Sequence, residues 1–500
     1  MALGRDGSTY LSYFVDMWHR TPAFPELMLF RTPGAPLMVG IPLRLGGAVL
    51  AEVAMAVAYA ASIVALYSVA IAVAGKRVAI AFAVVLLAYV PYGLLFHTLS
   101  SDAPFAFGLA LWAWLLVRAV GAPELRRFAF LGTATGLLIL IRPPSGALLL
   151  AFAIPVLVGR TWRRRILGAA AFALAAAVIV VGFEAYNDAR YGEFTVSRLT
   201  NATFPFYGIF TYDKLVSPNN GPESRALAAL VQSELLPREP YRSYGVTLHR
   251  FFSSGSVRAW DDLVTLSDQT WGWNDDYRHL RSVALEAIRR HPGAYAHDVL
   301  STVRIELAAK YVQGVPPRPG VPSAAPALEK VRGRLLPVPS EGEMIPEARQ
   351  HFVTSTPDDS IRWDWSNMES PHPVFSAAER KRNDRLMMES AHLTADVPNR
   401  AGSPTAAKWL NRVSNHVPSM TLWLIVGLLS LLPGRRRRAL APTLLAALAL
   451  AAIVTTAAAT PPTAQYRVPF DPIFLLFGIL GVTRVVDIVR PYLVRATQGL

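Results

Sequence analysis

The sequence predicts an all-α polytopic membrane protein with a large, mostly helical extracytoplasmic insertion. Hydrophobic residues make up 52% of the 500 positions and charged residues only 17%, and the mean hydropathy is +0.32. This balance is typical of multi-span membrane proteins and excludes an ordinary soluble enzyme. Apolar runs recur at both ends of the chain, and short basic clusters separate them. A long polar stretch lies between the two apolar portions.

About nine runs approach the length that a bilayer requires, roughly 20 residues of helix. We expect spans at 48–73, 78–96, 104–117, 128–141, 145–158, 166–183, 420–432, 439–460 and 473–489. The chain then divides into four parts. These are a first outer loop with the helix leading into the membrane (1–47), an N-terminal transmembrane module (48–183), an extracytoplasmic domain (184–418) and a C-terminal transmembrane module (419–500).

The basic clusters predict the orientation, because loops rich in Lys and Arg stay on the cytoplasmic side. They lie at Lys76-Arg77, Arg126-Arg127, 163–165 and 435–438. The net charge of +14 therefore reports topology, and nucleic acid is not an expected partner. An odd number of spans with the C-terminus inside places the N-terminus outside. That start is unusual without a preceding span, so we expect one N-terminal span to be missing.

Two further features narrow the chemistry. The chain has no cysteine, which excludes disulfides, thiolate nucleophiles and Cys-ligated metals. The first residues lack the basic and apolar regions of a cleavable signal peptide, so insertion is expected to use the spans themselves.

The polar insertion shows helical spacing of apolar residues at 223–236, 276–290 and 294–312. The stretches 316–326 and 337–346 are rich in proline and indicate loops. No strand alternation is clear, so the insertion is expected to be mostly helical.

Two segments of the insertion combine tryptophan with acidic residues, at 271–277 and 363–365. Aromatic rings and carboxylates together are typical of sugar-binding surfaces. Loops that anchor themselves by burying tryptophan have the same composition, and both interpretations stay open.

Several polar motifs from distant parts of the chain fall on the predicted outer face. They are the loop around Asp6, Phe30 to Gly34, His97 to Asp102, Arg142 to Pro144, Tyr186 to Asp188, and Gln465 to Arg467. Together they offer carboxylates, guanidinium groups and a membrane edge. Transfer from a lipid phosphate requires these three features.

The order of these motifs resembles a known family. The matching pieces are Asp6 with Tyr10, Arg31 to Leu37, Ser101 to Pro104, Gly136 to Pro143, Asn187 to Ser197, and Tyr466-Arg467 with Pro469 and Pro472. The chain resembles the C-type (GT-C) membrane glycosyltransferases, in the bacterial branch related to protein O-mannosyltransferases and to the aminoarabinose and Rgt-type transferases. This resemblance covers both membrane portions but not the middle of the insertion.

The resemblance implies an inverting enzyme that takes sugar from a polyprenyl-phosphate donor. The acid of the first outer loop is the general base in this family, and it corresponds to Asp6. The assignment is chemically reasonable, because a carboxylate within reach of a hydroxyl removes its proton as attack develops. Alternatively, Asp6 caps a short helix.

Asp102 corresponds to the second outer acid of the family, which positions the acceptor or helps to hold a divalent ion. The sequence Ser101-Asp102-Ala103-Pro104 is equally compatible with an ordinary helix start. His97 is a candidate partner of Asp102 at a metal ion. A solvated interfacial histidine is the alternative.

Arg31, Arg142 and Arg467 are the candidates for binding the donor phosphate, since guanidinium offers forked donors and keeps its charge. Tyr466 belongs to the same family motif as Arg467. Arginines that only extend toward the interface are the alternative for all three. Relatives carry Glu-Lys where this chain has Phe30-Arg31-Thr32, so the metal site is unknown and a divalent ion is only a possible cofactor.

The first functional hypothesis is a polyprenyl-phosphate-dependent hexosyl- or pentosyltransferase of a bacterial plasma (inner) membrane, with its active site on the extracytoplasmic face. Its partners would be the lipid-linked donor, an envelope glycan, lipid or protein acceptor, and membrane lipids. The alternatives are a multi-span transporter or lipid-sugar flippase, and a structural envelope protein with a decayed site. No motif encodes the donor sugar, the acceptor or the oligomeric state.

Overall fold

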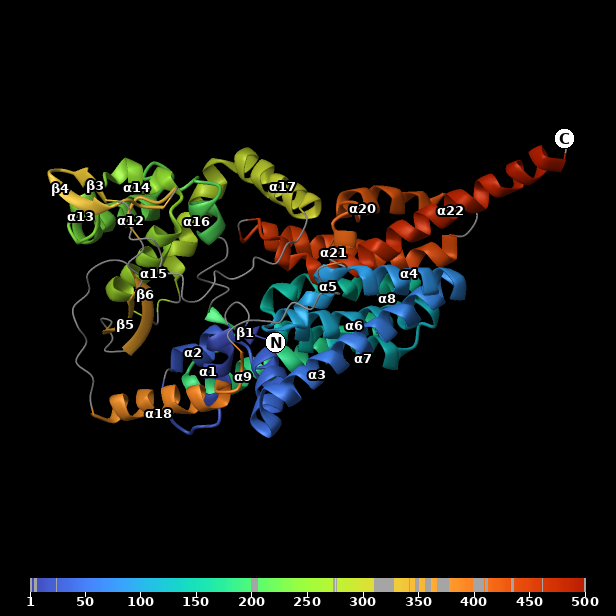
Figure 1. Cartoon of the computed structure of the whole chain (residues 1–500), viewed down its shortest axis with the longest axis horizontal. Helices are drawn as coiled ribbons and strands as arrows, with labels where there is room; N and C mark the ends of the chain where they lie inside the picture. The colour runs from blue at the N-terminus through green and yellow to red at the C-terminus, as the bar shows by residue number, and fades with distance from the viewer. Residues whose placement is uncertain are drawn as a thin grey trace.

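The structure is a computed structural model. It describes residues 2–3, 7–23, 25–198, 206–272, 275, 277–309, 328–340, 342–346, 350–355, 361–366, 377–398, 409, 412–432, 436–460 and 462–498. Figure 1 shows an elongated helical bundle with a separate group of helices at one end. The predicted all-α, multi-span architecture is confirmed, and the protein is a multi-pass membrane protein.

The bundle consists of helices from both ends of the chain. Its elements are α3 (Gly34–Ala74), α4 (Lys76–Ala88), α5 (Val90–Leu95), α6 (Asp102–Gly121), α7 (Leu125–Ile141), η1 (Pro143–Phe152), α8 (Ala153–Val158), α9 (Trp162–Tyr191), α20 (Met420–Leu428), η4 (Leu429–Leu431), α21 (Arg436–Ala457), η5 (Ala464–Tyr466), η6 (Val468–Phe470) and α22 (Asp471–Gln498). Within the described residues, five helices are long and apolar enough to cross a membrane. Two shorter apolar helical stretches, Pro143–Val158 and Met420–Leu431, add to them.

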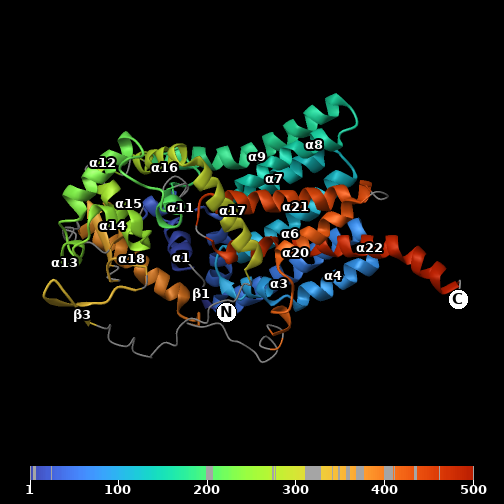
Figure 2. The same cartoon turned by 90° about the horizontal axis from the view of Figure 1, so that it is seen from above.

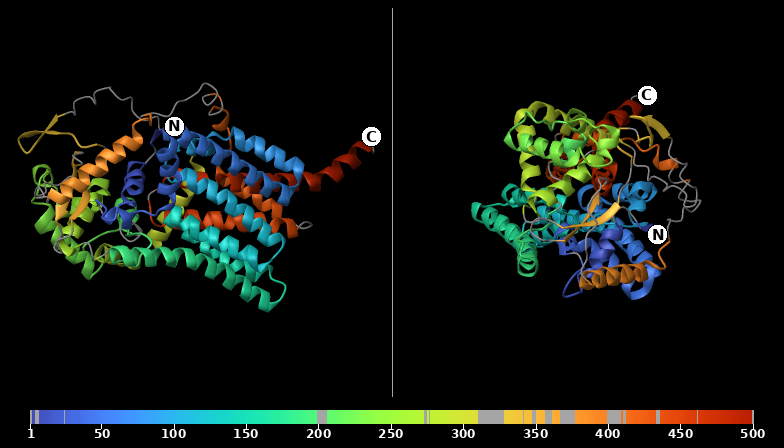
Figure 3. Two further views of the ribbon diagram at one scale, coloured as in Figure 1. Left: turned by 90° about the horizontal axis from the view of Figure 1, so that it is seen from below. Right: turned by 90° about the vertical axis from the view of Figure 1, so that its left-hand side faces the viewer.

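Close helix packing in the bundle depends on small residues, as is common where lipid replaces water. A Cβ at Gly132 of α7 would lie 2.1 Å from the Phe172 carbonyl oxygen of α9. A Cβ at Gly481 of α22 would lie 1.9 Å from the Val426 carbonyl oxygen of α20. These glycines allow the backbones to touch. In Figure 3, α9 runs along one side of the bundle and continues beyond it toward the insertion.

The insertion is mostly helical, as predicted. Its elements are α11 (Phe206–Thr211), α12 (Pro222–Leu230), η2 (Val231–Leu235), α13 (Tyr241–Tyr244), α14 (Leu248–Ser254), α15 (Val257–Trp271), α16 (Arg278–Arg290), α17 (Pro292–Ala308), β3 (Leu328–Val331), β4 (Arg334–Pro337), β5 (Gln350–Ser355), β6 (Ile361–Ser366) and α18 (Ala377–Thr394). The predicted helices at 223–236, 276–290 and 294–312 correspond to α12 with η2, to α16 and to α17.

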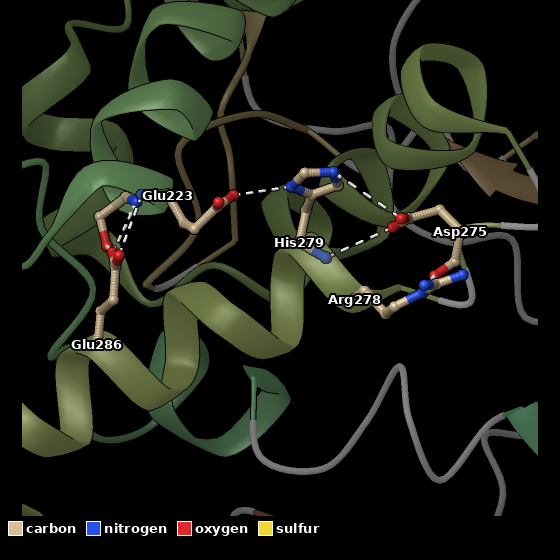
Figure 4. Close-up of polar contacts among 6 residues, drawn as sticks. Glu223, Asp275, Arg278, His279 and Glu286 are labelled. Atoms are coloured by element: carbon tan, nitrogen blue, oxygen red, sulfur yellow. Dashed lines mark hydrogen bonds and ion pairs between the residues drawn. The ribbon is translucent and has the colours of Figure 1, made fainter.

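The helix α16 contributes to a hydrophobic core of the insertion that is separate from the core of the bundle. Leu280, Val283, Ala284 and Ala287 are buried, and their spacing places them on one face. An adjoining face of α16 holds α12 through polar contacts, which Figure 4 shows. The Glu286 carboxylate accepts hydrogen bonds from the first backbone N–H groups of α12, which have no partner within that helix.

His279 joins the same pair of helices in Figure 4. Its Nδ1 lies 2.7 Å from Glu223 Oε2, and its Nε2 lies 3.8 Å from Asp275 Oδ1. Trp271 stacks on the imidazole at 4.3 Å between ring centroids. The Trp271 ring therefore packs against a residue of the same domain. Residues 273, 274 and 276 of this motif lie outside the described residues, as do the side chains of 363–365.

Two antiparallel hairpins, β3–β4 and β5–β6, were not predicted. Each strand of the first has four residues and is mostly exposed, which is too short for a recognisable alternation. The turn between them has positive φ at Arg332 and Gly333, as tight two-residue hairpin turns require.

The first residues and α17 link the insertion to the bundle. β1 (Ala2–Leu3) pairs in parallel with β2 (Thr98–Leu99), directly before α6. Helices α1 (Gly7–Asp16) and α2 (Pro25–Phe30) lie between the bundle and the insertion in Figure 1. In Figure 2, α17 leads from the insertion to the end of α21.

Candidate functional site

A cavity of about 390 Å³ lies where the bundle meets the first helices and the turn before α22. Its polar wall consists of Tyr10, Arg31, Ser101, Asp102, Arg142, Gln465 and Tyr466. Its apolar wall includes Phe30, Ile141, Pro143, Pro144, Ala147 and Ala459. The structure thus brings together most of the motifs that the sequence placed on one face.

Asp102 lies at the base of the polar wall, in the first turn of α6, and its side chain is almost fully buried. One carboxylate oxygen accepts a hydrogen bond from Arg142 Nη1 at 2.9 Å. The other accepts from the Gln465 side-chain amide, and Ser100 Oγ lies 3.4 Å away. Ser101 holds the N-cap position, without a side-chain bond to the helix. Asp102 therefore engages two distant segments, through Arg142 and Gln465, instead of capping its own helix.

Arg142 terminates α7, because the following Pro143 favours extended backbone and the helix stops there. Its guanidinium lies over the Tyr466 ring at 4.6 Å and over the Phe105 ring at 5.5 Å. Together with the ion pair to Asp102, these contacts hold the charged group at the cavity wall.

Arg31 and Tyr10 form the opposite part of the polar wall. The Arg31 guanidinium lies 5.1 Å from the centroid of the Tyr10 ring. Tyr10 donates a hydrogen bond to Ser101 Oγ at 3.1 Å, which ties α1 to the start of α6. Ser197 donates to the Phe30 carbonyl at 2.7 Å and fixes the backbone next to Arg31.

Arg467 lies behind the cavity and is buried, with 1% of its surface exposed. Its Nε bonds Asp471 Oδ1 at 2.8 Å, and its Nη1 donates to the carbonyl oxygens of Glu306 and Ala309. Tyr89 donates to the second Asp471 oxygen at 2.7 Å. Arg467 is not among the cavity residues. Its geometry is that of an anchor for the turn carrying Gln465 and Tyr466, and the predicted contact with phosphate stays a prediction.

His97 is exposed and does not line the cavity. Within the described part of the chain, no group of three or more His, Cys, Asp or Glu side chains is placed to hold a metal ion. Asp6, the predicted base, lies outside the described residues. The described segments on either side of it are β1, which pairs next to the start of α6, and α1, which brings Tyr10 to the cavity.

Glu306 is a residue near the site that the sequence did not single out. It belongs to a predicted helix, yet it is 1% exposed and its Oε1 accepts a hydrogen bond from the Thr463 backbone N–H at 3.1 Å. The buried stripe of α17 contains Thr302, Val303, Glu306 and Leu307. An acid inside an apolar stripe was the available signal.

The comparisons with known proteins bear on this region. Residues 31–185 match the model of the family described as dolichyl-phosphate-mannose-protein mannosyltransferase. This segment is similar to the C-type membrane glycosyltransferases. The match includes Arg31, Asp102 and Arg142, while Gln465 and Tyr466 lie beyond it.

Among solved structures, the crystal structure of ArnT from Cupriavidus metallidurans in the apo state aligns with 98% of this chain and 75% of that chain. The sequence identity is 12% and the TM-score is 0.31. A similarity at this level does not by itself indicate a shared activity. The comparison with curated proteins gave no match.

Proposed function

We propose that this protein is an inverting glycosyltransferase that moves a sugar from a polyprenyl-phosphate donor to a cell-envelope acceptor. The observation that carries the proposal is the cavity in which Arg31, Asp102 and Arg142 converge at one end of the apolar bundle. The family match over residues 31–185 supports it. By the predicted topology, the site would face the outside of a bacterial plasma membrane.

The cavity walls suit a lipid-linked phosphate. Arg31 and Arg142 would bind the phosphate, since guanidinium groups form charge-assisted hydrogen bonds with its oxygens. The Asp102 carboxylate orients Arg142 through the ion pair at 2.9 Å. The same guanidinium lies over the Tyr466 ring, 4.6 Å from its centroid. The apolar wall between η1 and α21 would receive the first isoprene units.

In the proposed reaction, an acceptor hydroxyl attacks the anomeric carbon from the side opposite the phosphate. The new bond joins the acceptor oxygen to this carbon, and the bond from the carbon to the phosphate oxygen breaks. Asp6 would take the hydroxyl proton as general base. The polyprenyl phosphate leaves with the bonding electrons, and Arg31 and Arg142 stabilise its charge. Inversion follows from the single displacement.

The described residues that line the cavity do not provide a set of ligands for a divalent metal ion. Among the described lining residues, Asp102 is the sole carboxylate, and Arg142 and Gln465 occupy its two oxygens. Divalent cations such as Mg²⁺ and Ca²⁺ require several oxygen ligands. The cations that face the phosphate in this proposal are therefore the two arginines.

A transporter or flippase remains the second candidate by class. The site residues, however, lie at helix ends, with Asp102 at the start of α6 and Arg142 after the end of α7. A translocation pathway would be expected to place such groups near the middle of the spans.

The test uses the full chain in liposomes with a radiolabelled polyprenyl-phosphate sugar and an envelope extract as acceptor. Wild-type protein should transfer label, and Asp6→Ala should reduce the rate by about 10²–10⁴-fold. Glu329→Ala, at an exposed acid on β3, is the matched control and should keep full activity. Undiminished transfer by Asp6→Ala would remove Asp6 from the chemistry. Label crossing the membrane without any glycosidic product would favour the flippase.

A further inference from the structure

The end of α17 holds the turn that completes the cavity. Glu306 accepts a hydrogen bond from the Thr463 N–H through its side chain. The carbonyl oxygens of Glu306 and Ala309 accept from Arg467, at the other end of the same turn. Residues 463–467 are therefore fixed at both ends by one short piece of the insertion.

This turn reaches the polar wall directly. Its Gln465 donates to the Asp102 carboxylate, and its Tyr466 lies against the Arg142 guanidinium. A continuous chain of contacts thus runs from Glu306 through the turn to the arginine proposed to bind phosphate.

The environment of Glu306 makes its charge costly. Its Oε2 is buried and has no hydrogen-bond partner among the described residues, and an ionised carboxylate with an unsatisfied oxygen is destabilised. Burial raises the pKa of the Glu306 carboxyl to about 7, while the Thr463 N–H, Arg467 and Arg142 oppose this shift. The group therefore changes charge near neutral pH.

Among the residues that the structure describes, the charged groups around Glu306 are few and come from defined elements. Arg142 and Arg467 act on it directly, and Asp471 is paired with Arg467. The helix α20 and residues 440–457 of α21, which pack against α17, contain no charged residue. Arg304 on α17 itself is exposed. The charged residues of α16 lie before His291, the residue that precedes α17. His291 is about 22 Å from Glu306 along the helix.

We propose that Glu306 is a positioning residue that holds the turn 463–467 and couples its own protonation to donor binding. The inference rests on the proposed function, because it requires an anionic phosphate beside Arg142. A phosphate there disfavours a second negative charge on Glu306, so the donor binds more tightly when Glu306 is protonated. By linkage, affinity falls as the pH rises through about 7, and binding above that pH takes up a proton.

The experiment measures binding of undecaprenyl methyl phosphate to the full chain in nanodiscs between pH 6 and 8. This probe is a phosphodiester, like the donor linkage, and its charge is constant over the range. We expect the wild-type Kd to rise roughly fivefold from pH 6 to 8, which corresponds to a rise of about one unit in the pKa of Glu306 on binding. Calorimetry at pH 7.5 in two buffers of different ionisation enthalpy should show proton uptake by the wild type.

Glu306→Gln keeps an acceptor for Thr463 but does not titrate, so its Kd should be constant with pH, with a kcat close to that of the wild type at pH 6. Glu329→Gln, at an exposed acid on β3, is the matched control and should follow the wild type. A pH-independent wild-type Kd, no proton uptake, or an unchanged pH dependence in Glu306→Gln would overturn the inference and leave the proposed function intact. No binding of the phosphodiester at any pH would overturn both.

Discussion

Two Arg–Asp pairs are connected through Tyr466, which contacts Arg142 and directly precedes Arg467, and their surroundings give them different properties. Arg142 and Asp102 pair at the wall of the cavity, where the guanidinium has 13% of its side-chain surface exposed. Arg467 and Asp471 pair behind the wall, with 2% and 0% exposed. The first pair adjoins space for a ligand, whereas backbone carbonyls and Tyr89 surround the second. Residue type alone therefore does not identify a phosphate site.

The largest expected effect is on the buried pair, Arg467 with Asp471. Arg467→Ala leaves Asp471 charged and buried, and breaking a buried pair in this way costs about 3–5 kcal/mol. We expect a markedly lower Tm in detergent, with activity lost through unfolding. The double variant Arg467→Met with Asp471→Leu should recover part of the Tm, since it removes both charges. An Arg467→Ala protein with wild-type Tm and weakened donor binding would show that Arg467 binds the phosphate and is not a structural anchor.

The pair at the cavity wall, Arg142 with Asp102, should show the opposite pattern. Arg142→Ala removes charge-assisted bonds worth roughly 1.5–3 kcal/mol, so the Kd of the phosphodiester probe should rise by about 10- to 150-fold. The Tm should fall less than in Arg467→Ala, because loss of the Arg142 side chain opens Asp102 to the water of the cavity that it lines. Arg126→Ala, at the other end of α7 and strongly exposed, controls for loss of a cation from the same helix. Unchanged probe affinity in Arg142→Ala would contradict the proposed role.

The smallest expected effect concerns Asp213, a partly buried carboxyl group near the second acid Asp298. It extends the comparison to an acid whose charged neighbour, among the described residues, is another acid and not an arginine. Burial, and to a lesser degree Asp298, raises the pKa of Asp213 from 3.8 to about 7. Between these values the folded state holds a proton that the unfolded state has lost, so stability falls as the pH rises across this window. Asp213→Asn should raise the Tm above pH 7 and have little effect near pH 4. The gain should stay below about 1 kcal/mol, because Asp213 is partly solvated.

The control for this variant is Asp298→Asn, which removes the neighbouring charge and should give a smaller gain in the same direction. A Tm gain for Asp213→Asn that is equal at pH 4 and pH 8 would exclude titration as its cause.

Much of the fold was predictable, because hydropathy and helical periodicity are local signals. The five long apolar helices of the described residues, α12 with η2, α16 and α17 follow from them directly. The hairpin β3–β4 was missed because its strands are short and exposed, and its Arg332-Gly333 turn has no strong sequence signature.

The site was predictable in its parts but not in its arrangement. Asp102, Arg142 and Tyr466 were found as motifs, and all three line the cavity. The family motif favoured Arg467 as a phosphate ligand, but Arg142 lines the cavity and Arg467 does not. Which of them faces the cavity depends on how the turn before α22 packs against α17. Glu306 lay in a predicted helix, but its contact with Thr463 joins residues 157 positions apart. Sequence periodicity carries no information about such a pairing.

The position of α17 has a consequence for protein engineering. A chimaera that combines this bundle with the insertion of a relative would test which part of the chain selects the acceptor. The junction should lie before Tyr295, whose hydroxyl donates to the Ala458 carbonyl at the end of α21. Residues 295–309 would then travel with the bundle, as would the segment ending at Ser197. With a junction after Ala309, residues of the relative would replace Glu306 and Ala309, which hold the turn 463–467. A change in acceptor specificity could then not be separated from damage to the donor site.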